Sequence, residues 1–268
     1  MNGVRIDHHR ANGPVLQGGR ESTNRLPAPS PDDSVSARLL PTVLSLIAGS
    51  TDVIGFLALN GLFTAHITGN LVILAAHIAR GVPAGLAPML SVPMFVIVLG
   101  LARWLAGVLQ SKQIASLLPL LLVQFLLLVG FLAVGVGTDA ADSPDAPGAI
   151  VAGMLGVGAM AVQNALVQLS LKGVPSTAVM TTDVTRFVMD AGTVLLRYDR
   201  DEVEQATVRV KRTWSAIVGF AFGGGIGAIC EIAFGLWSLL LPAGLALAAV
   251  ALGASAQAAA EKRGTDQS

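Results

Sequence analysis

The sequence predicts an all-α polytopic membrane protein built from two internal repeats, and three observations support this fold class. Hydrophobic residues make up 53% of the 268-residue chain and charged residues only 13%, with a mean hydropathy of +0.68. This mean hydropathy and this low share of charged residues lie far from the averages of soluble proteins. Uncharged runs such as 53–79, 113–138 and 232–260 exceed the roughly 20 residues that cross about 30 Å of hydrocarbon. Two polar interruptions in equivalent places indicate the repeat.

Eight apolar segments follow one another along the chain, and the second and sixth differ from the others. Each of these two is long enough to cross a membrane, yet each has polar residues within it, at 66–70 and 181–190. We therefore expect six full spans plus two broken or re-entrant segments, or else eight spans. The segments cover roughly 38–59, 62–80, 86–108, 114–137, 148–171, 176–196, 214–234 and 236–257.

The two interruptions also indicate an internal duplication. Residues 65–71 lie over residues 178–184 at an offset of 113, and 117–119 lie over 240–242 at an offset of 123. A longer connector at 197–213 accounts for the difference. The expected organisation is a disordered N-terminal tail (1–36), a first membrane repeat (37–138), an acidic loop (139–147), a second membrane repeat (148–258) and a C-terminal tail (259–268).

Lys and Arg near the segment ends predict the orientation, since cytoplasmic loops carry an excess of them. If the second and sixth segments dip in and return, both termini and nearly all basic residues lie in the cytoplasm. Only Arg80 then lies outside, with the acidic loop, and the repeats are inverted. If all eight segments cross, Arg103, Lys112 and Lys172 face outward and the repeats are parallel. The basic residues favour the first arrangement, the segment lengths the second.

Only four acidic residues fall within the apolar segments. A charged side chain near the centre of a bilayer costs roughly 2.5–3.5 kcal/mol on insertion scales, so such residues pair, line a wet cavity or do chemistry. They are therefore the best indication of a polar site inside the membrane. The four are Asp52, Asp183, Asp190 and Glu231.

In the first half, the candidate site residues are Asp52 and the triplet Thr68, Gly69 and Asn70. Asp52 follows two hydroxyl residues that can satisfy it, and it is a candidate proton or cation carrier. It is equally a candidate structural hub that bonds to Asn70 or Gln163. The triplet predicts a broken helix, and unwound backbone at membrane depth occurs where protein covers it or it lines a cavity.

The second half supplies the matching candidates. Asp183, Arg186 and Asp190 stand at i, i+3 and i+7, so on a helix they share one face. Arg186 can neutralise the two acids, or Asp183 can act as the ligand with Arg186 as its counter-ion. The remaining candidates are neutral ligands: Gln163, Asn164, Thr181 and Thr182.

Other features point away from different functions. The chain has no phosphate-binding lysine loop, His-Glu-x-x-His motif or nucleophile elbow, so we expect no enzyme. Its single cysteine, Cys230, excludes a multi-cysteine metal site, and we expect neither metal nor cofactor. A formal net charge of zero gives no reason to expect nucleic acid. Glycines at 219, 223 and 227 predict close helix packing.

Three stretches resemble a known family, the YoaK family of bacterial integral membrane proteins with a domain of unknown function. They are 47–56 with its Gly-x-x-Asp pattern, Phe63 with 68–71, and 161–165 with 177–185 in the second half. The resemblance covers about residues 38–257. It implies a polytopic inner-membrane protein with about six spans, and it supplies no established substrate.

The residues themselves predict a small secondary transporter with a polar intramembrane site where the two repeats meet. Asp52 and Asp183 would couple a cation or proton across a shared pocket. The alternatives are a non-transporting scaffold or assembly protein, whose buried polar groups serve packing, and a passive channel. The expected partners are the lipid bilayer and an unknown small molecule or ion, with no nucleic acid and with a possible homo-oligomer.

Overall fold

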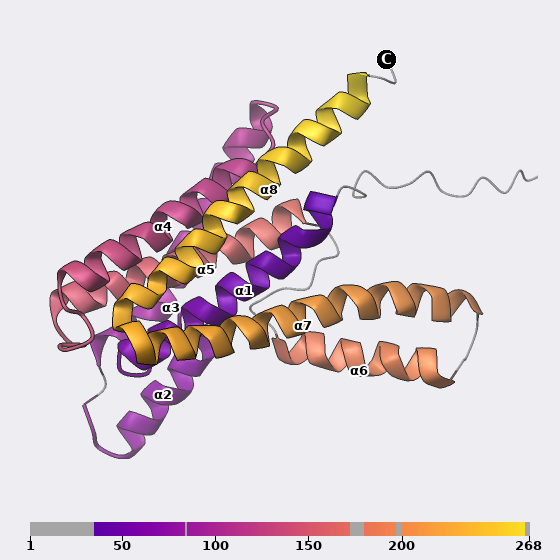
Figure 1. Ribbon diagram of the computed structural model, residues 1–268. Helices are drawn as coiled ribbons and strands as arrows, with labels where there is room; N and C mark the ends of the chain where they lie inside the picture. The colour runs from indigo at the N-terminus through magenta and orange to yellow at the C-terminus, as the bar shows by residue number, and fades with distance from the viewer. Residues whose placement is uncertain (1–34, 84, 172–179, 197–199, 266–268) are drawn as a thin grey trace, which may run out of the picture. The chain divides into compact units, whose positions relative to one another are not determined.

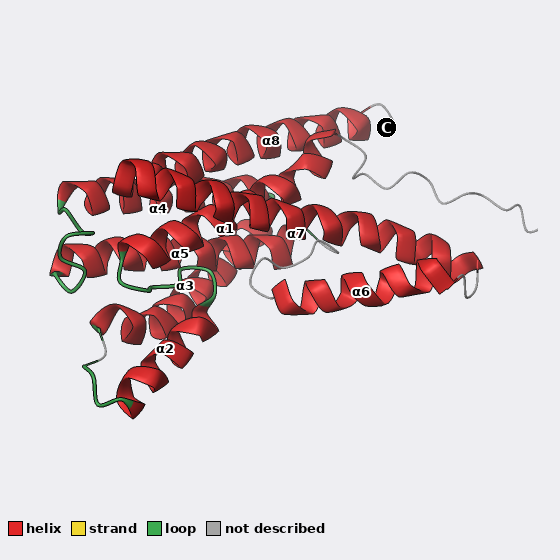
Figure 2. Ribbon diagram, turned by 60° about the horizontal axis from the view of Figure 1, so that its bottom comes forward, coloured by secondary structure: helices red, strands yellow, loops and turns green. Residues whose placement is uncertain are grey.

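The computed structural model describes residues 35–83, 85–171, 180–196 and 200–265. Within these residues the chain is helical and contains no strand (Figure 2). Residues 1–34 of the expected tail lie outside the described part. The elements are α1 (Val35–Ala58), α2 (Ile67–Ala79), α3 (Leu86–Ser111), α4 (Leu117–Gly137), α5 (Pro147–Ser170), α6 (Met180–Leu196), α7 (Arg200–Phe234), η1 (Gly235–Leu239) and α8 (Leu240–Thr265).

Five helical stretches among the described residues are long and apolar enough to cross a membrane, so the chain is a membrane protein by length and composition. They are Leu39–Ala58, Leu86–Ser111, Leu117–Gly137, Pro147–Ser170 and Asp201–Ala259, the last of which runs through most of α7, η1 and most of α8.

The second predicted segment forms a shorter helix than expected, and the described part of the sixth, 180–196, is a short helix. Helix α2 has 13 residues and a length of about 20 Å, because the first part of the expected 62–80 segment is a loop. Helix α6 has 17 residues and a mixed composition. Neither is among the spanning stretches, which removes the length argument for eight spans.

The helices pack in a regular set of pairs (Figure 1). Helix α1 packs on α7 and α8, and it touches α5 in a smaller contact. Helix α5 packs on α3 and α4, and α4 also packs on α8. The two short helices each accompany the helix that follows them, α2 with α3 and α6 with α7.

Small residues explain the contact between α1 and α7. A Cβ on Gly223 would lie 2.3 Å from Leu46 O, and one on Gly49 would lie 2.1 Å from Phe220 O. The two backbones therefore approach closely, as the glycine spacing predicts. Since Gly219 lies against Thr42 and Gly223 against Leu46, the two helices run in the same direction.

Helix α7 has 35 residues, because the expected connector at 197–213 is helical from Arg200 onward. Its apolar second half packs on α1, and its polar first half runs beside α6. The Phe187 and Trp214 rings stack with centroids 5.5 Å apart, and Arg209 pairs with Asp190. These contacts make α6 and α7 an antiparallel hairpin.

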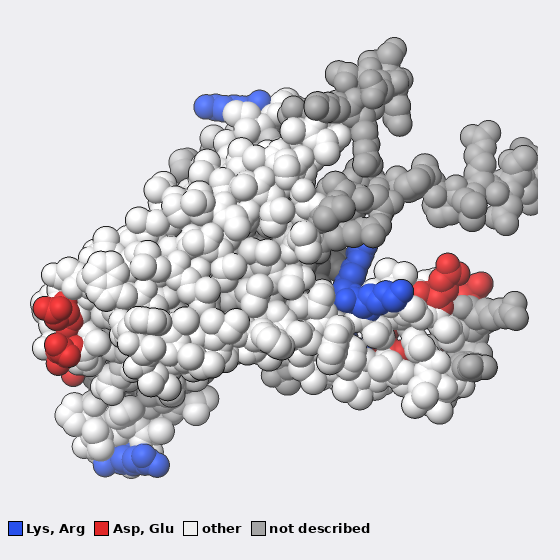
Figure 3. All heavy atoms as spheres, viewed as in Figure 1, with Lys and Arg blue, Asp and Glu red and all other residues white. Residues whose placement is uncertain are grey.

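Few charged side chains are buried among the described residues, Asp52 and Asp183 being two of them. On the face shown in Figure 3 the charged side chains gather at the ends of helices and on the α6–α7 hairpin. Asp139 and Asp142, in the acidic loop, are exposed. Helix α8 continues to Thr265, past the expected end of the second repeat at 258.

Candidate functional site

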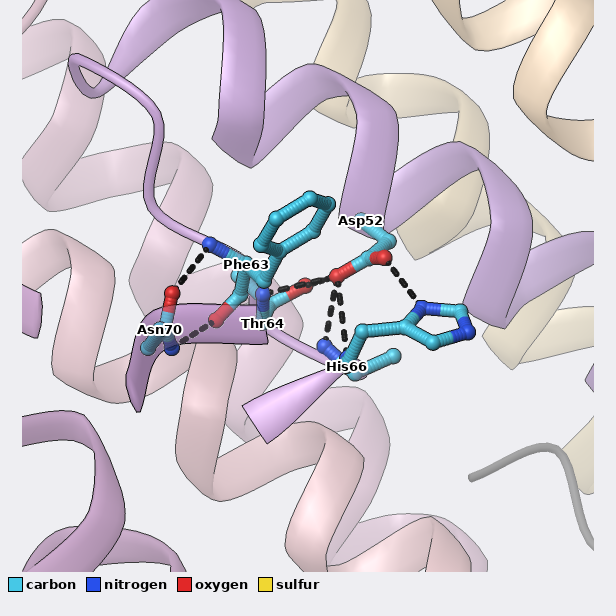
Figure 4. A network of polar contacts seen from close by, with 6 residues as sticks. Asp52, Phe63, Thr64, His66 and Asn70 are labelled. Carbon is cyan, nitrogen blue, oxygen red and sulfur yellow. Dashed lines mark hydrogen bonds and ion pairs between the residues drawn. The ribbon is translucent and has the colours of Figure 1, made fainter. Parts of the chain in front are cut away.

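Asp52 lies in α1 with 3% of its surface exposed, and the loop between α1 and α2 folds around its carboxylate (Figure 4). Oδ1 accepts hydrogen bonds from the backbone N–H groups of Thr64 at 2.8 Å and Ala65 at 2.7 Å. The Thr64 hydroxyl and the His66 backbone N–H lie farther away, at 3.3 and 3.4 Å. Asp52 thus supplies the acceptor that this buried loop needs.

His66 contacts the second oxygen of the same carboxylate. Its Nδ1 lies 2.7 Å from Asp52 Oδ2, while 31% of the imidazole side chain is exposed. The ring makes edge contacts with Phe63 and, at a centroid distance of 5.3 Å, with Phe220 of α7. This Asp52–His66 pair therefore joins α1, the start of α2 and α7.

The hydrogen bonds of Asp52 differ from those expected. Its partners are the 64–66 loop and His66, and neither Asn70 nor Gln163 donates to it. The hydroxyls of Ser50 and Thr51 bond to carbonyl groups of their own helix. Side chains that follow one another on a helix point in different directions, so sequence neighbours did not identify the partners.

Asn70 holds the other side of the same loop. Its Oδ1 accepts from Phe63 N at 2.9 Å, and its Nδ2 donates to Phe63 O at 2.8 Å and to Ser91 Oγ of α3 at 2.9 Å. Thr68, Gly69 and Asn70 lie in the first turn of α2. The expected break inside a helix is therefore the start of one. Thr68 is exposed, and Gly69 lies against the Phe63 ring.

Gln163 and Asn164 are buried in α5. Gln163 Nε2 donates to Leu44 O of α1 at 2.9 Å, and Gln163 Oε1 accepts from Gln124 Nε2 of α4 at 2.6 Å. Asn164 Nδ2 donates to Met160 O in its own helix. Gln163 consequently connects three helices at the centre of the bundle.

Asp183 lies in the first turn of α6 with 2% of its surface exposed. Its Oδ2 is buried and has no hydrogen-bond partner in the part of the chain that the structure describes. Burial raises the pKa of Asp183 to about 6, against the lowering influence of Arg186. Helix α6 is not one of the spanning stretches.

The three charged residues of α6 do not act as one unit. Arg186 is exposed while Asp183 is buried, and Asp190 pairs with Arg209 of α7 through contacts of 2.7 and 3.0 Å. The sequence offered Arg186 as the residue that neutralises Asp190, and in the structure Arg209 of the neighbouring helix pairs with Asp190. Thr182 is exposed, and the Thr181 side chain lies outside what the structure describes.

The candidate residues thus fall into three places. Asp52 and Asn70 hold one loop, Gln163 bonds to α1 and α4, and Asp183 lies in the α6–α7 hairpin. The hydrogen bonds described above hold these three groups separately, whereas the transporter hypothesis places them around one pocket.

Two residues of these networks, His66 and Gln124, were not among the candidate site residues that the sequence indicated. His66 lies two residues before the polar triplet of α2, and Gln124 is the lone polar side chain in the apolar run Leu117–Gly137. Both positions are visible in the sequence. Their partners depend on a loop and a neighbouring helix, so their roles became apparent only in the structure.

Comparison with known proteins gives a family and no activity. Residues 40–252 match the family described as "Protein of unknown function (DUF1275)". The match supports the domain of unknown function that the resemblance implies and covers nearly the same residues. No curated protein and no solved structure matches the chain.

Proposed function

The chain belongs to this family, DUF1275, and we propose that it is a small secondary transporter, of the YoaK type, in a bacterial inner membrane. The observation that carries the proposal is the Asp52–His66 pair. A buried carboxylate contacts a partly exposed imidazole beside α2, which is too short to cross. Ionisable groups within membrane segments are costly and commonly mark ion or substrate pathways.

In this proposal the polar residues of the two halves serve one transport cycle. Asp52 with His66, and Asp183, are the coupling groups, and Gln163 and Asn164 are neutral ligands. Of the remaining candidates, Thr68, Gly69 and Asn70 shape the start of α2, and Thr181, Thr182 and Arg186 belong to the first two turns of α6. Since the Asp52 carboxylate bonds both to this loop and to His66, a rearrangement of the loop around Asp52 would also alter the Asp52–His66 contact, which gives coupling a physical basis.

The pairing of the helices supports an internal repeat. Suppose that helices α1 to α4 exchange places, in order, with helices α5 to α8. The packed pair of α1 and α7 then becomes the pair of α5 and α3, the pair of α1 and α8 becomes that of α5 and α4, and the pair of α2 and α3 becomes that of α6 and α7. The pairs α4–α8 and α1–α5 convert into themselves. Every helix pair described above therefore has its counterpart, as a two-fold relation between the halves requires.

The direction of the equivalent helices favours inverted repeats over parallel ones. Gln163 bonds to Leu44 near the start of α1, whereas Gly153 lies against Leu59 just after its end. Helices α1 and α5 thus run in opposite directions. Inverted repeats are common in transporters that work by alternating access.

We further propose six crossings with both termini in the cytoplasm. The chain bends at η1 (Figure 1), where Gly235 has a φ of 55°, and on this proposal the stretch Asp201–Ala259 crosses twice. Ser36 and Ser255 bond at 2.9 Å, which places the start of α1 and the end of α8 at one end of the bundle. Because α7 runs with α1, the basic residues Lys211 and Arg212 belong to that end, which the positive-inside tendency assigns to the cytoplasm.

Transport is tested on the full chain reconstituted in liposomes that contain a pH-sensitive dye. Panels of amino acids, carboxylates, amines and monovalent salts are added under an imposed gradient. We expect one class to move protons or charge, and Asp52→Asn and Asp183→Asn to abolish that flux while the protein still folds. Ser50→Ala, whose hydroxyl bonds only within α1, should transport normally. Normal flux in both Asn variants would refute the site assignment.

One observation favours a second candidate, a non-transporting scaffold. Both oxygens of Asp52 already have partners, as expected of a group that only holds a loop. A scaffold would show no flux with any compound in the panel. A passive channel would instead show flux that follows the gradient of the permeating ion and moves no second species.

A further inference from the structure

Among the acidic candidates, Asp183 is the one that is buried without hydrogen-bond donors at both carboxylate oxygens among the described residues. It is 2% exposed, and its buried Oδ2 has no hydrogen-bond partner among the described residues. Asp52, by contrast, has donors at both oxygens. A carboxylate buried without donors is unfavourable when ionised and is more stable as the neutral acid.

The neighbouring charges do not compensate for this burial. Helix α6 packs against α7, and the α7 residue Arg209 is bound to Asp190 rather than to Asp183. On α6 itself, Arg186 is exposed, and it is the charged group whose field acts on Asp183. Helix α6 thus has one acid, Asp190, held by an ion pair and, two turns earlier, one acid whose Oδ2 has no hydrogen-bond partner among the described residues.

The described residues around Asp183 also differ from a site built of several acidic ligands for a metal cation. Hard cations bind through several oxygen ligands at once, and the described residues contain no cluster of three or more acidic, His or Cys side chains. A proton needs only one carboxylate oxygen. Of the two coupling ions that a carboxylate could serve, the surroundings of Asp183 fit the proton.

We propose that Asp183 binds and releases the coupling proton of this transporter, so that H⁺ and not a metal cation drives the cycle. This inference rests on the proposed transport function. The step is an ionisation in which the carboxylate takes up H⁺ from water on one side and returns it on the other. No bond other than O–H forms or breaks, and no electrons are transferred.

The test uses dicyclohexylcarbodiimide, which reacts with protonated carboxyl groups in apolar surroundings. The full chain in lipid nanodiscs is labelled between about pH 5 and about pH 8, and the modified peptide is identified by mass spectrometry. We expect labelling at Asp183 to fall as the pH rises and to be unaffected by added Na⁺. Asp183→Asn should remove the label, whereas Asp190→Asn, on the same helix, should retain it.

The outcomes separate this inference from the proposed function. Protection by Na⁺ at constant pH, or no labelling at any pH, would overturn Asp183 as the proton site. If substrate-driven flux nevertheless persists, the protein remains a transporter coupled elsewhere. If labelling depends on pH as expected but no compound drives flux, the proton site remains and the transport function fails.

Discussion

Replacing Asp52 with alanine should destabilise the protein much more than replacing it with asparagine. Asp52→Ala leaves the buried backbone N–H groups of Thr64 and Ala65 without an acceptor and His66 without its partner. Each unsatisfied N–H costs about 1–3 kcal/mol, and a hydrogen bond to a charged group is worth about 1.5–3 kcal/mol. Allowing for non-additivity, we expect a loss of roughly 4–6 kcal/mol.

Asp52→Asn preserves most of this arrangement. The amide oxygen can still accept from Thr64 N and Ala65 N, and the amide nitrogen can donate to His66 once the imidazole adopts its other tautomer. We therefore expect a loss of only about 1–2 kcal/mol, mainly from the weaker, uncharged contact with His66.

The difference between the two variants, about 3 kcal/mol, is measured by equilibrium unfolding in mixed detergent micelles. Hydrogen exchange at residues 63–66 should accelerate in Asp52→Ala and remain near wild type in Asp52→Asn. Ser50→Ala serves as the matched control in the same helix. Equal losses in the two Asp52 variants, or unchanged exchange in the alanine variant, would show that the carboxylate does not hold the loop.

Three further predictions concern packing, the central network and pH. Gly223→Ala places a methyl group against a backbone carbonyl and should cost about 1–3 kcal/mol, whereas Gly225→Ala, which faces open space, should be neutral or slightly stabilising in thermal melts. Gln163→Leu should cost about 1–3 kcal/mol, and adding Gln124→Leu should recover much of it; additive losses in this double-mutant cycle would contradict the pairing. Burial raises the pKa of Asp183 to about 6, so the folded protein holds a proton that the unfolded chain releases. The free energy of unfolding is therefore full below about pH 4 and falls by up to about 3 kcal/mol as the pH rises through 6. Asp183→Asn should remove this dependence, and an unchanged pH profile would contradict it.

The expected helices follow from the sequence where apolar length decides the structure. The stretches that became α3, α4 and α5 were predicted to within a few residues. The second segment was predicted too long because its first residues are as apolar as those of the helix that follows. They form a loop since Asp52 and Asn70 satisfy its backbone polar groups, and apolar content does not reveal such capping.

The sequence by itself determined that this chain enters a membrane and which polar residues are exceptional there. Hydrocarbon thickness and the cost of burying charge are properties of the solvent, so composition and spacing are enough to show them. The tertiary structure alone decided which of those residues have partners. Asp52 finds its donors in a loop, Asp190 finds Arg209 on the next helix, and Asp183 has no hydrogen-bond partner among the described residues. Such contacts depend on how helices and loops pack, and no local pattern records them.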